Sequence, residues 1–142
     1  MESALTRPTV YTGTRPTTAW WVGAVITTLV ALFLVFDFGI KFTTNDAVVT
    51  AFAELAYPMS LASAIATLEA FCLLVYLVPR TSILGALLLT GYLGGAIASH
   101  VRIGSPLFSH VLFPIYVALM IWGGLILRDD DLRAFVRRRI RE

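Results

Sequence analysis

Long apolar runs alternate with short polar segments along the whole chain. A run of about 20 residues in an α-helix spans the ~30 Å hydrocarbon core of a bilayer. The polar segments between the runs are too short to form a second domain. The pattern predicts an all-α fold, an integral membrane four-helix bundle. The expected spans cover residues 19–40, 60–78, 81–99 and 107–127.

The segments between the spans carry weaker signals. In residues 42–59, Val48, Phe52 and Leu55 recur at helical spacing, which predicts a short extracytoplasmic interfacial helix. The dipeptide Pro79-Arg80 favours a tight turn, so the second and third spans should be antiparallel neighbours. A loop over residues 100–106 then leads to the fourth span.

The two ends of the chain differ from the spans and from each other. Residues 1–18 form a polar segment that we interpret as a cytoplasmic tail. Residues 128–142 begin with Arg128 and an acidic stretch, followed by an apolar stripe and five further arginines. This pattern predicts a cytoplasmic amphipathic helix that lies on the lipid surface, where anionic headgroups attract arginine. Nucleic-acid binding is the rival interpretation of the arginines, and we expect no nucleic-acid partner.

Basic residues are distributed unequally between the two sides of the expected bundle. Short cytoplasmic loops of membrane proteins carry an excess of Lys and Arg. Counted by side, the chain has nine basic residues at one end of the bundle and two at the other. The asymmetry places both termini in the cytoplasm. The nine are Arg7, Arg15, Arg80, Arg128, Arg133, Arg137, Arg138, Arg139 and Arg141, and the two are Lys41 and Arg102.

Composition agrees with a membrane protein and limits the chemistry. Hydrophobic side chains make up 58% of the chain, charged ones 14%, and the mean hydropathy is +0.81. The single cysteine, Cys72, excludes an intramolecular disulfide, a CxxC redox pair and a cysteine zinc cluster. A redox role would therefore need a cofactor or a partner protein.

Ionisable residues inside apolar spans are costly, so each one is a candidate functional residue. Glu69 is the strongest candidate, because a carboxylate at that depth has to be protonated, paired or hydrated. The expected orientation brings the polar residues of the spans into the outer half of the bundle. We therefore predict one outward-facing pocket. Its candidate catalytic residues are Glu69, His100, His110 and Asp37, and its candidate substrate-binding residues are Arg102, Tyr92 and Tyr116.

Each of these candidates also has a purely structural interpretation. Glu69 could be a neutral acid that is hydrogen-bonded to a neighbouring helix, and the histidines could be interfacial residues in water. Arg102 beside Asp37 could be only a structural ion pair. The glycines of the third span favour close helix packing. Pro114 predicts a kink in the fourth span, since it cannot donate a hydrogen bond to the carbonyl of His110.

Several short motifs give the chain a family resemblance. It resembles the DoxX-like family of four-helix bacterial membrane proteins from about residue 37 to residue 129. Ala56 and Thr67 depart from the pattern, since relatives often have glycine at both positions. The shared motifs are Asp37 to Lys41 followed by Phe42, Tyr57-Pro58, Leu68-Glu69, Pro79-Arg80, Leu84-Gly85-Ala86, the 90–96 segment Thr-Gly-Tyr-Leu-Gly-Gly-Ala, His100-Val101-Arg102 with Gly104, His110 with Leu112-Phe113-Pro114, and Trp122-Gly123-Gly124-Leu125 before Arg128.

The resemblance implies a bacterial inner-membrane location and a loose association with redox physiology. Relatives include a subunit of thiosulfate:quinone oxidoreductase. On that basis the first functional hypothesis is a redox-associated subunit that binds a quinone-like lipophilic molecule, in contact with a redox partner protein or a second copy of the chain. Histidine and carboxylate side chains could bind the quinone oxygens and move protons.

Three other functions remain open from the residues alone. The chain could be an isomerase, hydratase or hydrolase that uses Glu69 with Asp37 or a histidine as an acid and base pair. Haem or a metal ion could bind through His100 and His110, with Glu69 or Asp37 as an added ligand. A non-enzymatic scaffold or assembly factor would instead use the glycine face and the arginine-rich tail as working surfaces.

Overall fold

A computed structural model describes residues 17–43 and 45–141 of the chain. These residues contain no β-strand, and four of their helices are long and apolar enough to cross a membrane, which confirms the predicted fold class. The predicted tail over residues 1–18 lies almost wholly outside the described residues. In chain order the elements are α1 (Thr18–Lys41), α2 (Asp46–Glu54), the 3-10 turn η1 (Met59–Leu61), α3 (Ala62–Leu77), α4 (Ser82–Arg102), the π-helical turn η2 (Leu107–Val111), α5 (Phe113–Arg128) and α6 (Asp130–Arg141).

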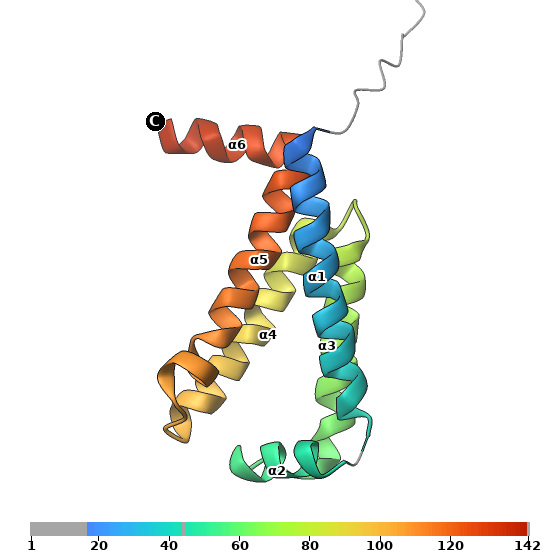
Figure 1. The fold of residues 1–142 in the computed structure, drawn as a ribbon, viewed down its shortest axis with the longest axis vertical. Helices are drawn as coiled ribbons and strands as arrows, with labels where there is room; N and C mark the ends of the chain where they lie inside the picture. The colour runs from blue at the N-terminus through green and yellow to red at the C-terminus, as the bar shows by residue number, and fades with distance from the viewer. Residues whose placement is uncertain (1–16, 44, 142) are drawn as a thin grey trace, which may run out of the picture.

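The four long helices form a closed ring of contacts. α1 packs against α3 and α5, and α4 packs against the same two helices. In Figure 1, α6 lies across one end of the bundle and α2 across the other. We call these the terminal end, where α1 begins and α5 ends, and the cavity end, where α1 ends. Whether either short helix lies at a membrane interface stays a prediction.

The interior of the bundle is a continuous apolar core, and its outer faces are apolar as well. Leu34, Tyr76 and Leu89 are fully buried between the helices. On the outside, Phe36 is 68% exposed and Leu74 is 65% exposed. Large apolar side chains exposed on several sides are stable only in a lipid environment, so these faces support four membrane-spanning helices.

Glycine allows close helix contact at two places near the terminal end. A methyl group added at Gly85 of α4 would lie 2.2 Å from the backbone of Tyr76 in α3. One added at Gly23 of α1 would lie 2.8 Å from the carbonyl oxygen of Gly124 in α5. The predicted packing role of the α4 glycines therefore holds for Gly85 but not for three others. A methyl group at Gly91, Gly94 or Gly95 would meet nothing within 4 Å in this chain.

The third span continues beyond its predicted end. α4 extends to Arg102, so His100 and Arg102 belong to a helix and not to the expected loop. The helix ends because Gly104 adopts a left-handed backbone with φ of +69°. The Gly104 N–H then donates to the Val101 carbonyl at 3.1 Å and the Ser105 N–H to the His100 carbonyl at 3.0 Å. This pair of bonds is a Schellman cap, which fixes Ser105 beside His100.

The fourth span is interrupted near its start, where the sequence predicted a kink. It opens with the π-helical turn η2, and α5 begins only at Phe113, with Pro114 in its first turn. Proline fits there because the N–H groups of the first turn have no partner within the helix. This discontinuity rotates α5 about its axis relative to the residues that precede it. It therefore changes which side chains of α5 face the interior.

Local contacts and backbone conformation fix how the two short helices join the bundle. Arg133 of α6 donates to the carbonyl of Leu127 at 2.9 Å, a bond that satisfies a free carbonyl at the end of α5. Two residues after the end of α2, Ala56 adopts φ of +53°, which is unusual for a residue with a side chain. Glycine adopts this conformation without strain, which agrees with the glycine that the family resemblance leads us to expect at this position.

Candidate functional site

A cavity of about 970 Å³ lies at the cavity end of the bundle, and we call it the main cavity. All four long helices contribute to its wall, together with α2 and η2, and most of the lining side chains are apolar. Five of the seven predicted site residues line it. They are Asp37, Glu69, Tyr92, His100 and His110.

A cluster of four polar side chains forms one part of the wall, which we call the Lys41 cluster. The Lys41 ammonium donates to a carboxylate oxygen of Asp37, to Oε2 of Glu69 at 2.7 Å and to the Tyr92 hydroxyl at 3.1 Å. Tyr92 in turn donates to Oε2 of Glu69 at 2.8 Å. Asp37 and Lys41 are one helical turn apart on α1, Glu69 comes from α3 and Tyr92 from α4. The cluster thus joins three of the four long helices.

The hydrogen-bond balance of the cluster leaves one acceptor open. The three protons of Lys41 already have three acceptors, and the Tyr92 proton is used by Glu69. Glu69 is fully buried, and its second oxygen, Oε1, has no hydrogen-bond partner in the described residues. An unsatisfied buried acceptor is costly, so a donor that enters the cavity would be favoured next to this oxygen.

The charges of the cluster point the same way. Two carboxylates, those of Asp37 and Glu69, are paired with the single ammonium of Lys41. The cluster therefore has a formal charge of −1 when all three groups are ionised. A hydrogen-bond donor or an incoming proton would offset this charge where little water can do so. The arrangement can bind a donor and exchange a proton with it.

The two histidines meet on another part of the same wall. The ring centroids of His100 and His110 are 5.3 Å apart, with the rings edge to face. Nδ1 of His100 bonds to the Ser105 hydroxyl at 3.0 Å, and Nδ1 of His110 bonds to the Ser109 hydroxyl at 2.8 Å. These bonds hold both rings and leave Nε2 as the nitrogen of each ring that can serve a ligand.

Arg102 does not occupy the predicted position beside Asp37, and it does not line the main cavity. Its guanidinium donates to the carbonyl of Leu55 and lies 5.4 Å from the ring centre of Tyr57. Tyr57 bonds to the Ser99 hydroxyl at 2.8 Å. Arg102 therefore connects the end of α4 to the segment after α2, and the ion pair considered for Arg102 with Asp37 is formed by Lys41 instead.

Tyr116 was also predicted to bind substrate and is not part of the wall. Its side chain is 46% exposed, whereas the neighbouring Val117 is buried and faces the main cavity. Successive residues of a helix point about 100° apart, so only one of the two can face the interior. Because α5 begins after the π-helical turn, its rotation could not be derived from a continuous helix.

The metal interpretation finds no complete ligand set in the described part of the chain. No group of three or more His, Cys, Asp or Glu side chains comes together in residues 17–43 and 45–141 in a way that could hold a metal ion. Cys72, one turn after Glu69, is buried and also lines the main cavity. It has no second cysteine with which to form a disulfide.

Lys41 belongs to one of the family motifs but was not predicted as a site residue. It was taken as the polar end of the first span and as a basic residue outside the membrane. Its spacing of four residues from Asp37 was the available signal, because a carboxylate and an ammonium at that spacing pair on one helix face. The structure brings this pair to Glu69, which gives the buried carboxylate its partner.

Comparison with known proteins agrees with the resemblance seen in the motifs. The DoxX-like family model matches residues 25–124, which contain the Lys41 cluster and both histidines. No match was found among curated proteins or among solved structures.

Proposed function

This chain belongs to the DoxX-like family, and on that premise we propose that it is a redox-associated membrane subunit that binds a quinone-like molecule in the main cavity. The observation that carries the proposal is the Lys41 cluster, with its open Glu69 oxygen, on the wall of a largely apolar cavity of about 970 Å³. Binding sites for small apolar ligands typically have about this volume and a few fixed polar groups.

The cluster favours the reduced form of such a ligand. A quinone offers only acceptor oxygens, whereas the donors of Lys41 and Tyr92 already have acceptors. A hydroquinone offers O–H groups, and one of them could donate to Oε1 of Glu69. Oxidation of the hydroquinone would release two protons and two electrons. The cluster could take up a proton, and the electrons would pass to a partner protein, since the chain has only one cysteine.

The histidine pair supports a second polar contact for the same ligand. A hydroquinone has hydroxyl groups on opposite sides of its ring, and the main cavity has polar groups on two parts of its wall. If Nδ1–H of a ring donates to its serine hydroxyl, Nε2 of His100 or His110 can accept a hydrogen bond from the second hydroxyl of the ligand. Histidine is also suited to carry the second proton away.

Two measurements on the purified protein test the proposal. The first identifies any bound lipophilic molecule, and the second compares the binding of the reduced and oxidised forms of a quinone. Solvent extraction and mass spectrometry should identify a bound quinone or hydroquinone. In a titration with decylubiquinol and decylubiquinone, the reduced form should bind about tenfold more tightly, since a hydrogen bond to a charged acceptor contributes ~1.5 kcal/mol or more. Equal or weaker binding of the reduced form would contradict the role of Oε1.

A matched pair of variants locates the effect. Glu69→Gln should remove the preference for the reduced form, because the charged acceptor is lost. Glu54→Gln makes the same change at an exposed carboxylate that also borders the main cavity, and it should leave binding unchanged. If both variants lose the preference equally, the Lys41 cluster is not the binding group.

A second candidate is an enzyme that performs acid and base chemistry on an apolar molecule. The favouring observation is that Glu69 is fully buried while the side chain of Asp37 is 37% exposed, although both bond to Lys41. Two carboxylates in different environments are typical of an acid and base pair. Absence of any bound quinone after extraction, together with release of a chemically altered lipophile, would favour this candidate.

The proposed location is the bacterial inner membrane, with both termini in the cytoplasm. The support is the excess of basic residues at the terminal end, which includes Arg80 and Arg128 among the described residues. With this orientation the main cavity would lie in the outer half of the membrane. A ligand could then enter from the lipid or from the periplasmic side.

A further inference from the structure

We propose that a second pocket, at the terminal end of the bundle, binds an anionic phospholipid, with the phosphate on Arg128 and an acyl chain along α1. The pocket has a volume of about 360 Å³ and lies on the outside of the bundle. It shares none of its lining residues with the main cavity. The inference is therefore independent of the proposed function.

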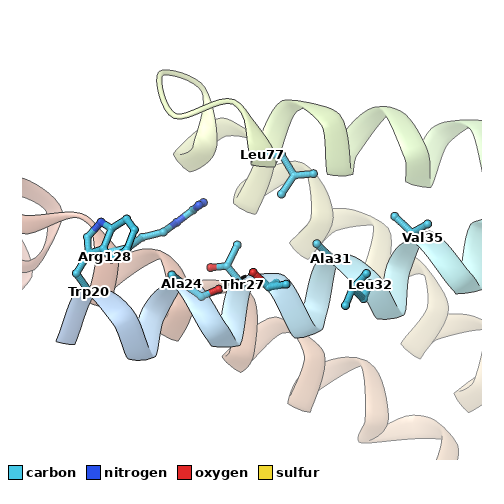
Figure 2. Close-up of a pocket in the computed structure, with 9 residues that line it drawn as sticks. Trp20, Ala24, Thr27, Ala31, Leu32, Val35, Leu77 and Arg128 are labelled. Atoms are coloured by element: carbon cyan, nitrogen blue, oxygen red, sulfur yellow. Dashed lines mark hydrogen bonds between the residues drawn. The ribbon is translucent and has the colours of Figure 1, made fainter. Parts of the chain in front are cut away.

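The pocket has a polar end and an apolar end. Figure 2 shows Trp20 and Arg128 together at one end, with Ala31 and Val35 further along α1. Leu77 of α3 forms the opposite wall. A headgroup site continued by an apolar channel has the form of a phospholipid, whereas a soluble phosphate would use only the polar end.

The length of the pocket fits one leaflet of a bilayer. The 15 residue-to-residue steps from Trp20 to Val35 rise by about 22 Å along α1. Half of a bilayer with its headgroups measures about 20–22 Å. Indole side chains prefer the headgroup level, and Trp20 stands where the phosphate is expected. An acyl chain that starts at Trp20 would thus reach the middle of the membrane near Val35.

Arg128 supplies the charge that selects an anion. Its guanidinium lies 5.2 Å from the ring centre of Tyr76 and donates to the Ser82 hydroxyl at 3.5 Å. These contacts orient the side chain without neutralising it, and Arg128 forms no ion pair with a carboxylate within the described residues. Guanidinium groups bind phosphate through two parallel hydrogen bonds, which a lipid phosphate can accept.

The test measures lipid binding to the full chain in detergent micelles by native mass spectrometry. Dioleoyl phosphatidylglycerol should bind in preference to the zwitterionic dioleoyl phosphatidylcholine. Arg128→Gln should weaken phosphatidylglycerol binding about tenfold, as expected for the loss of a charge-assisted bond. Arg80→Gln removes the same charge from the exposed turn between α3 and α4, and it should have no effect. An equal loss in both variants, or no preference over phosphatidylcholine, would overturn the proposal.

A second variant keeps the test valid if the Arg128 change disturbs folding through Tyr76 or Ser82. Ala24→Leu narrows the pocket and leaves Arg128 intact. It should weaken phosphatidylglycerol binding by a similar factor, while the Ala19→Leu variant, on the same helix but outside the pocket, should not. Inorganic phosphate at millimolar concentration should not displace the lipid. Displacement would show that the anion site is open to water and that the acyl channel plays no part.

Discussion

At the scale of single residues, the Lys41 ammonium determines the charge balance inside the bundle. It compensates part of the charge of Asp37 and Glu69, and its side chain is only 16% exposed. Buried ion pairs of this kind add little net stability compared with apolar packing. Removing one partner, however, leaves the others unpaired in a medium of low dielectric constant. The cluster is therefore a functional arrangement that the fold has to stabilise elsewhere.

This asymmetry leads to a prediction for Lys41→Met. The variant should be destabilised by about 3 kcal/mol, because Glu69 loses its cation while remaining buried. The double variant with Lys41→Met and Glu69→Leu should recover much of this loss, because no unpaired buried carboxylate remains. The measurement is thermal unfolding in detergent at neutral pH. A double variant no more stable than Lys41→Met alone would show that Lys41 stabilises the fold by packing and not by charge.

Sequence reasoning was effective for the residues that are unusual in a span. Glu69 and the histidines were recognised because an ionisable group within an apolar run needs an explanation, and the structure brings them to one cavity. Lys41 was missed because its position at the end of a span also fits a residue in water. Arg102 and Tyr116 were misplaced because the sequence does not specify rotation about a helix axis.

At the scale of the elements, α3 and α4 are in close contact near the terminal end and leave space between the helices near the cavity end. α3 and α4 meet at Gly85, which touches the backbone of Tyr76. Towards the cavity end, Gly91 and Gly95 of α4 line the main cavity. Small residues thus serve two purposes on α4, since they permit contact at one level and leave volume free at the other.

The two kinds of glycine should respond differently to the same substitution. Gly85→Ala should destabilise the bundle by about 3 kcal/mol, because its methyl group has no room beside the Tyr76 backbone. Gly94→Ala is the matched control on the same helix, and it should change stability little, since its methyl group would meet nothing within 4 Å. Thermal unfolding in detergent measures both. Destabilisation by Gly94→Ala would indicate a partner on that face, such as a second copy of the chain.

The existence of the elements could be predicted from the sequence better than their ends. Apolar runs of span length predicted all four long helices, because a helix satisfies every backbone hydrogen bond within its own segment inside a membrane. The end of α4 was placed three residues early, at Ser99 instead of Arg102, because histidine and arginine fit a loop as well as a last helical turn. The π-helical turn η2 leaves no simple sequence signal beyond Pro114.

At the scale of the whole molecule, most of the described arginines and the main cavity lie at opposite ends of the bundle. The described arginines at the terminal end include Arg80, Arg128 and those of α6, whereas the main cavity and the histidines lie at the cavity end. Lys41 was counted with the cavity end, but it is bonded within the bundle and is not a loop residue. Among the described residues, Arg102 is then the only Lys or Arg at the cavity end that is still counted as lying outside the bundle.

This sharper asymmetry predicts the orientation in the membrane. A reporter fused after residue 142 should lie in the cytoplasm, so green fluorescent protein should fluoresce there and alkaline phosphatase should be inactive. Fusion after Ser105, between α4 and η2, ends the chain after three spans and should give the opposite result.

Alkaline phosphatase activity at residue 142 would reverse the orientation. The main cavity would then lie in the cytoplasmic half of the membrane, and the arginines of α6 would face the periplasm, where the lipid pocket would have to draw on the outer leaflet. Because both proposals name a ligand that dissolves in lipid, this measurement decides from which leaflet each ligand enters.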